Sequence, residues 1–393
     1  MHERQLRKLA GRLQAVTRNT TIVEGYPCAE IALQLRELAD YTARIYSGSE
    51  VSSGDIFSYV YVRLMNFTTE VLAYSTQEVS DGTPLLDVTD REKIEKFENG
   101  LLEYLTSAPH DYLVRLLIQT GVNEEVACWR LTEFLHLEVC LEAPAVQSPG
   151  GGRSRNLYLV MPVNGFYSPK LECSLARRCI QLVKVFLFVA WSLHNKTYNL
   201  EFRKNFASQG AFDKRVVSNR YLEVLKPKGI CPLPIRLPSE LASFVDGFSL
   251  RDCVGELTLA SLSPIAHESS TEAERIRAAI EWYIDAVISD TETVKFIQFC
   301  IGLESLLGDE LSDVPLSKTL ADRCSYLVSN TIQNRAVIRK QFMEMYKVRS
   351  KVIHGTSRNM TDKEREHLEF ARRMLSACIA KEIEYLASAH ERA

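Results

Sequence analysis

The chain has 393 residues, of which 46% are hydrophobic and 25% are charged, which excludes an intrinsically disordered protein. Its length allows about two or three domains. The 47 basic and 50 acidic residues give a net charge of −3, which excludes a uniformly basic nucleic-acid coat protein. A local basic patch remains compatible with this balance.

Residues 1–20 are charged throughout and contain no apolar stretch typical of a signal peptide. The most apolar segment, Val185–Leu193, is shorter than the roughly 20 residues of a membrane-spanning helix, so we interpret it as part of a buried helix. None of the ten cysteines forms a CxxC pair, the spacing typical of zinc and redox sites. We therefore expect a cytosolic protein with free thiols, no membrane contact, no metal and no other cofactor.

Before residue 147 the chain is predicted to be mostly helical. Two segments, Pro27–Tyr46 and Asp90–Ser107, place apolar residues at intervals of three and four. A glycine-rich loop, 147–156, lies between two short apolar runs. This pattern predicts either two strands with a flexible connection or a linker between domains. The next helix is predicted near residues 172–194.

A proline-rich stretch, Leu225–Glu240, excludes a long helix in that part of the chain. We place the main domain boundary near residue 265. The N-terminal region, 1–265, is predicted to be helix-rich with some β structure. The C-terminal region, 266–393, has apolar periodicity for about five helices with short connections, with Thr271 as the first N-cap and Gly308 as a C-cap. The predicted fold class is mainly α, with a C-terminal helical bundle.

One segment of the bundle, Tyr346–Gly355, carries residues suited to phosphate chemistry. Arg349 and His354 are separated by four residues, an offset of about 140° beyond one full turn on an ideal helix. On a regular helix the two side chains would not share one face, but they could converge if His354 lies at a frayed helix end, with Gly355 as a left-handed cap. The interval 335–358 contains seven basic residues and one acid, which suits a phosphate-binding strip or an ordinary solvated helix face.

The hexapeptide Arg349–His354 matches the R-x4-H motif of HEPN domains. Three further features follow the same order as in the Apea-like branch of that superfamily: GLESLLG, LADRCSYL and a closing helix after YKVRSKVIHG. The chain therefore resembles an Apea-like HEPN domain over about residues 273–388.

The resemblance implies a metal-independent endoribonuclease in which two bundles pair as a homodimer and their R-x4-H motifs form one composite cleft. Arg349 would bind phosphate oxygens, and His354 would transfer protons. Such proteins are often prokaryotic toxins or anti-phage effectors that cut tRNA or other cellular RNA. A sensor, an antitoxin or a phage-derived trigger would control the activity, and residues 1–265 would sense or position a partner.

Each candidate residue also has a structural interpretation. Arg349 is a type often found in ion pairs, and His354 often caps a helix C-terminus. Tyr346 either supports the site or belongs to the core. Glu304 and Arg323 either pair with each other, which we favour, or support the Arg349 site. Three exposed-type residues of the same helix are supporting candidates or solvated side chains: Lys347, Ser350 and Lys351.

Two alternatives to a nuclease remain open. HEPN bundles also serve as non-catalytic dimerisation or RNA-binding modules. The chain is also compatible with a subunit of a larger defence complex that needs a separate partner for activity.

Overall fold

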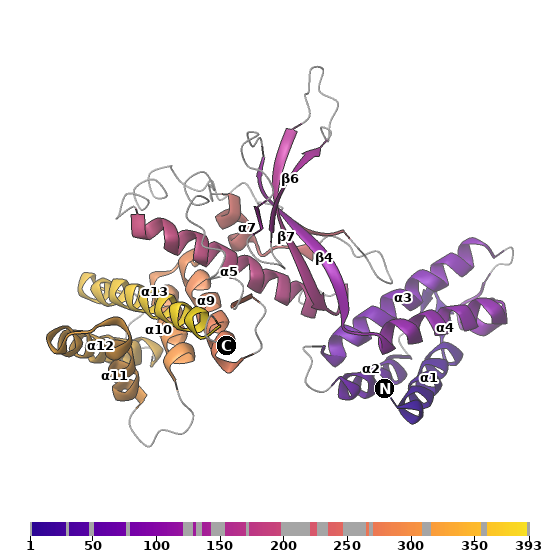
Figure 1. Cartoon of the computed structure of the whole chain (residues 1–393). Coiled ribbons are helices and arrows are strands. Elements are labelled where there is room, and N and C mark those ends of the chain that lie inside the picture. The colour runs from indigo at the N-terminus through magenta and orange to yellow at the C-terminus, as the bar shows by residue number, and fades with distance from the viewer. Residues whose placement is uncertain are drawn as a thin grey trace. The chain divides into compact units, whose positions relative to one another are not determined.

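The computed structural model describes residues 2–28, 31–46, 51–75, 79–120, 129–130, 136–142, 154–169, 173–197, 221–225, 235–246, 265–266, 270–308, 316–354 and 360–390. Its fold is mainly α with smaller β-sheets, as the sequence predicts (Figure 1). Within these ranges, no helix has both the length and the apolar character needed to cross a membrane. Most of the predicted loop, residues 147–153, lies outside the described residues, as does Gly355.

Contacts divide the chain into two compact units. The first consists of Met1–Leu116, Val160–Cys179 and Tyr221–Arg236, and the second consists of Leu117–Leu159, Ile180–Arg220 and Leu237–Ala393. Both units are therefore discontinuous along the chain. The sequence predicted a single domain boundary near residue 265, and that boundary stays a prediction.

The first unit contains four amphipathic helices that enclose one apolar core. Their bounds are α1 (Glu3–Arg18), α2 (Ala32–Ile45), α3 (Ser53–Ala73) and α4 (Arg91–Thr106). Leu9, Leu35, Tyr59 and Leu101, one from each helix, are almost completely buried in this core. A three-stranded sheet in the order β2-β1-β3 and the short helix η2 complete this part: β1 (Thr21–Val23), β2 (Tyr26–Pro27), β3 (Thr83–Pro84) and η2 (Leu85–Asp87).

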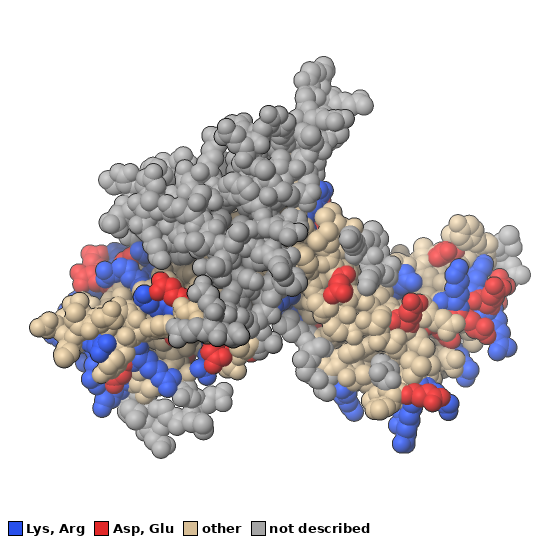
Figure 2. Space-filling model, viewed as in Figure 1, with Lys and Arg blue, Asp and Glu red and all other residues tan. Residues whose placement is uncertain are grey.

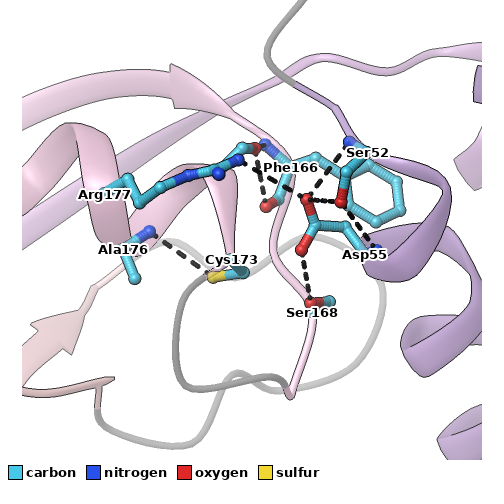
Figure 3. A network of polar contacts seen from close by, with 8 residues as sticks. Ser52, Asp55, Phe166, Ser168, Cys173, Ala176 and Arg177 are labelled. Atoms are coloured by element: carbon cyan, nitrogen blue, oxygen red, sulfur yellow. Dashed lines mark hydrogen bonds and ion pairs between the residues drawn. The ribbon is translucent and has the colours of Figure 1, made fainter.

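A buried carboxylate fixes the start of α3 (Figure 3). The Asp55 backbone N–H donates to Ser52 Oγ at 3.1 Å and the Ser52 backbone N–H donates to Asp55 Oδ2 at 3.2 Å, which forms a capping box. The Ser52 hydroxyl also donates to Oδ2, at 2.7 Å. Asp55 is completely buried, so it needs further partners. Arg177 Nη2 lies 3.8 Å from Oδ2, and Ser168 donates to Oδ1 at 3.4 Å. The carboxylate thus joins α3 to residues 113 and 122 positions later in the chain.

A six-stranded sheet has the order β5-β6-β7-β4-β8-β9. Its strands are β4 (His110–Thr120), β5 (Trp129–Arg130), β6 (His136–Glu142), β7 (Ser154–Gly165), β8 (Tyr221–Val224) and β9 (Ile235–Arg236). The predicted strand pair around loop 147–156 is confirmed, because β6 and β7 are neighbours. Strand β4 was not predicted, although its alternating buried residues Tyr112, Val114, Leu116 and Ile118 form a period-two pattern.

Helix α5 (Ser174–Thr197) confirms that Val185–Val189 is buried. Within the second unit this helix packs on the first helix of the C-terminal bundle. Lys184 Nζ lies 2.7 Å from Asp285 Oδ1, and the rings of Phe188 and Tyr283 meet edge to face at 5.1 Å. The short helix α7 (Ser239–Asp246) also belongs to this unit.

The C-terminal bundle has the five predicted helices. They are α9 (Thr271–Ile288), α10 (Glu292–Leu307), α11 (Leu316–Val328), α12 (Ile332–Ile353) and α13 (Asp362–His390). The N-cap of α9 is Ser270, whose hydroxyl accepts from the Ala273 backbone, so the prediction of Thr271 was wrong by one residue. Gly308 is the C-cap of α10, as predicted, but its backbone is extended and not left-handed.

Helices α9, α10 and α13 approach closely at Gly302 in α10. A Cβ atom at this position would lie 2.5 Å from Leu375 Cδ2 and 3.2 Å from Trp282 Cβ. Only glycine therefore lets the three helices pack without displacement. Gly302 is two residues before Glu304, so this contact also fixes the position of Glu304 along the axis of the bundle.

We predict that Gly302→Val lowers the free energy of unfolding by about 2 kcal/mol, because overpacking a close-packed core costs roughly 1–3 kcal/mol. The matched control is Gly11→Val, on the exposed side of α1, where a Cβ atom meets nothing within 4 Å. This control should change the free energy by less than about 0.5 kcal/mol. Urea unfolding followed by circular dichroism measures both, and equal effects would contradict the close approach.

Candidate functional site

Glu304 lies in the last turn of α10 and accepts hydrogen bonds from two side chains of α12. Tyr346 Oη donates to Oε1 at 2.6 Å, and Arg349 Nη2 lies 2.9 Å from Oε1 and 3.1 Å from Oε2. The side chains of Arg349 and Glu304 are only 27% and 21% exposed. We call Glu304, Tyr346 and Arg349 the α10–α12 polar cluster.

The spacing of residues in α12 places the two donors side by side. Tyr346 and Arg349 are three positions apart, and the Arg349 guanidinium carbon lies 5.8 Å from the centre of the Tyr346 ring. One turn earlier, the buried Phe342 ring stacks on Tyr346 with centroids 5.4 Å apart. The tyrosine is therefore held by an apolar contact on one side and a hydrogen bond at its tip.

Burial sets the protonation of the uncharged groups around this cluster. Burial, followed by the hydrogen bond to Glu304, raises the pKa of Tyr346 far above its ordinary value. Burial also raises the pKa of the Cys300 thiol, with Glu304 raising it further and Arg349 opposing the shift. The phenol and the thiol thus stay neutral at physiological pH. Cys300 in this state is a packing residue and not a nucleophile.

His354 is the C-cap residue of α12 and is exposed to solvent. Its backbone N–H donates to the Ser350 carbonyl at 3.1 Å, so the helix is not unwound at this position. The offset of Arg349 and His354 therefore stays close to that of a regular helix, and the convergence at a frayed end is not seen. Among the described residues, the imidazole has no hydrogen-bond or ion-pair partner.

The remaining candidates of α12 are exposed: Lys347, Ser350 and Lys351. On a helical wheel, Lys347 and Lys351 fall within about 60° of Lys340 and His354, on the side opposite the buried residues. We call Lys340, Lys347, Lys351 and His354 the lysine face of α12. Figure 2 shows Lys and Arg side chains gathered over the end of the bundle that α11 and α12 form.

Arg323 has a different role from the one favoured by the sequence. Its Nη1 donates to the Leu307 carbonyl at 2.7 Å, which supplies a partner for a free carbonyl at the end of α10. The structure thus brings Glu304, Tyr346 and Arg349 together. Arg323 supports the same helix end through the backbone.

The sequence interpretation missed Phe342 and Cys300. The position of Phe342, four residues before Tyr346, is a signal that predicts contact on a helix. Cys300 is four residues before Glu304 and carries the same signal on α10. Within the described ranges, no group of three or more His, Cys, Asp or Glu side chains is arranged to hold a metal ion.

Comparison with known proteins gives no relative. No protein-family model matches the chain, and neither a curated protein nor a solved structure is significantly similar to it.

We predict that Glu304→Gln lowers the free energy of unfolding by about 2 kcal/mol, because it removes the countercharge of a half-buried arginine. The control is Glu344→Gln, an exposed residue of α12, which should change the free energy by less than about 0.5 kcal/mol. Urea unfolding of the full chain compares the two. A similar small effect of both substitutions would show that the ion pair contributes little to stability.

We predict that the stability difference between wild type and Tyr346→Phe depends on pH only in the alkaline range. The raised pKa keeps the folded phenol protonated, whereas the unfolded phenol ionises near pH 10. The stabilisation by Tyr346 should therefore be constant below about pH 10 and decline above it. Denaturation midpoints of both proteins at several pH values test this, and a decline beginning near neutral pH would contradict it.

Proposed function

We propose that this chain is a metal-independent endoribonuclease of the HEPN type, active as a homodimer, with Arg349 and His354 in the site. The proposal rests on the resemblance of the bundle to the Apea-like HEPN branch. The observation that supports it best is the state of the two residues. Arg349 is anchored by Glu304, and the imidazole of His354, at the end of the same helix, is exposed and has no partner among the described residues.

Arg349 has groups left for a phosphate. Glu304 binds Nη2, and Nε is buried without a hydrogen-bond partner among the described residues, so a phosphate has access only to the exposed part of the guanidinium. An arginine carries five N–H donors in a planar fork, and this geometry fits two phosphate oxygens. The ion pair with Glu304 fixes one edge of the fork. A phosphate would reach only the part of the guanidinium that is exposed, and that part would stabilise the additional negative charge that forms on the phosphoryl oxygens during cleavage.

His354 would transfer protons. Histidine as a residue type exchanges protons near neutral pH. In the reaction, the 2′-oxygen of the RNA forms a bond to phosphorus while the bond to the 5′-oxygen breaks. One group accepts the proton of the 2′-hydroxyl and another supplies a proton to the leaving 5′-oxygen. The products are a 2′,3′-cyclic phosphate and a 5′-hydroxyl.

The helical offset of the two residues favours a site built from two copies. In one chain Arg349 faces α10, while His354 belongs to the exposed lysine face. A second bundle, packed against the first, would supply the imidazole or guanidinium that one chain does not bring together. The two His354 residues would then share the acid and base roles.

The biological role follows from the resemblance. The enzyme would be a prokaryotic, cytosolic toxin or anti-phage effector that cuts tRNA or another cellular RNA. Residues 1–265 would receive the trigger, which is a sensor, an antitoxin or a phage component. The lysine face of α12 would contact the RNA backbone next to the reactive group.

A non-catalytic RNA-binding module is the second candidate, and one observation favours it. Arg349 already has an intramolecular carboxylate partner at 2.9 Å, as expected for an arginine with a structural role. In that case the lysine face binds RNA, and the bundle serves as a dimerisation element or as a subunit of a larger complex.

We predict that the purified chain cuts single-stranded RNA or tRNA in EDTA and that His354→Ala and Arg349→Ala each lower the rate at least about 100-fold. The controls are His2→Ala at the N-cap of α1 and Arg373→Ala on the exposed side of α13, which should cut like wild type. Gel analysis with end-group mapping detects the cyclic phosphate. Thermal unfolding shows whether the variants fold. Equal cutting by wild type and a folded His354→Ala would refute the site.

A further inference from the structure

The first turns of α12 extend beyond the core of the bundle. Ile332 is 84% exposed and Val337 is 55% exposed, and the buried residues of α12 begin only at Phe342. The adjacent end of α11 presents Tyr326, which is 64% exposed. A tyrosine with this exposure lies outside the apolar core, so packing in the core does not explain why an aromatic residue stands at this position.

Tyr326 is nevertheless held in a defined position. The guanidinium carbon of Arg335 lies 4.2 Å from the centre of the Tyr326 ring, which is a cation–π contact. Arg335 Nε donates to the Ser329 carbonyl at 2.8 Å, and this bond fixes the guanidinium over the ring. A ring ordered in advance loses less conformational entropy when a flat ligand stacks on it.

The charge around this ring selects the kind of partner. The described side chains of α11 and α12 include eight basic and two acidic residues, so eight minus two gives +6 in a chain of net −3. The basic residues are Lys318, Arg323, Arg335, Arg339, Lys340, Lys347, Arg349 and Lys351. Among them, Arg339 is paired with Asp322 at 2.9 Å, and Arg349 is paired with Glu304 of α10 at 2.9 Å. The remaining excess favours a polyanion, whereas the centre of a protein–protein interface is depleted of charge.

We propose that Tyr326 and Arg335 form a stacking platform for an unpaired base of single-stranded RNA. The inference rests on the proposed function and assigns a substrate-binding surface outside the Arg349/His354 site. Arg335 precedes His354 by 19 residues, so the platform lies about 28 Å from the imidazole along the helix. An RNA strand with its backbone on the basic side chains and one base on Tyr326 would lie along α12, so that a fixed nucleotide of the strand reaches Arg349 and His354. Double-stranded RNA offers no free base face and would not use the platform.

The test is RNA binding by the full-length chain carrying His354→Ala, which prevents cleavage during the measurement. Fluorescence anisotropy follows a labelled single strand of about 12 nucleotides, within the range of sites on stacking proteins. Tyr326→Ala should weaken binding about 5- to 150-fold, the equivalent of roughly 1–3 kcal/mol for one stacked base. Tyr326→Phe should restore most of the affinity, because the ring remains.

Two controls separate stacking from charge and from misfolding. Tyr385→Ala removes another exposed tyrosine, on α13, and should bind like the parent. The salt dependence of binding should have the same slope with and without Tyr326, since a neutral ring releases no counterions. A duplex of equal length should bind Tyr326→Ala and the parent equally.

The proposal is overturned if Tyr326→Ala binds the single strand like the parent, if Tyr326→Phe is as weak as Tyr326→Ala, or if the parent does not bind the single strand. These results are independent of cleavage. Loss of binding in Tyr326→Ala without any cutting by wild type would support the platform and favour a non-catalytic RNA-binding module or an enzyme that cuts only with its trigger. Cutting by wild type with equal binding by Tyr326→Ala would refute the platform and leave the nuclease standing.

Discussion

The hydrogen bonds that Glu304 accepts from Tyr346 and Arg349 are the constraint on which the arrangement of the bundle surface depends. A carboxylate with this little exposure is stable only with charged or polar partners, and α12 supplies both of them within one turn. Satisfying the two bonds fixes the rotation of α12 about its axis. Because the helix is regular through His354, that rotation also decides that the lysine face points to solvent. A partly buried ion pair on one side of α12 thus determines which basic side chains of the helix are exposed on the other.

Much of the bundle was predictable because its signals are local. Apolar residues at intervals of three and four identify all five helices, and Gly308 marks the end of α10. The sequence could not distinguish Ser270 from Thr271 as the N-cap, since serine and threonine both favour that position. The structure shows that the helix begins at Thr271, which makes Ser270 the N-cap. Strand β4 was missed because apolar residues occur on both of its faces, which hides the alternation of the buried side chains.

The partners of the site residues depend on tertiary contacts and were only partly predictable. The sequence marks Glu304 as a charge that needs a partner, but Arg323 and Arg349 are equally good candidates by type. The decision comes from the packing of α12 on α10, which brings together residues 45 positions apart. Arg323 then finds a backbone carbonyl at the end of the same helix. The exposure of Tyr326 likewise depends on how far α12 extends past the core, which no periodicity encodes.

The division of the first unit into three chain segments has a consequence for its synthesis. Helices α1–α4 emerge from the ribosome first, but their core includes Phe166, and the Asp55 carboxylate needs Ser168 and Arg177. The unit is complete only when residue 236 has been made, 120 residues after residue 116. Phe166, Ser168 and Arg177 are made sooner, within 61 residues of residue 116, which takes roughly 3–12 s at about 5–20 residues per second. During that time Asp55 has Ser52 as a partner but lacks Ser168 and Arg177, and the apolar core lacks Phe166. Such a nascent chain is a natural client for a chaperone bound near the exit of the ribosome.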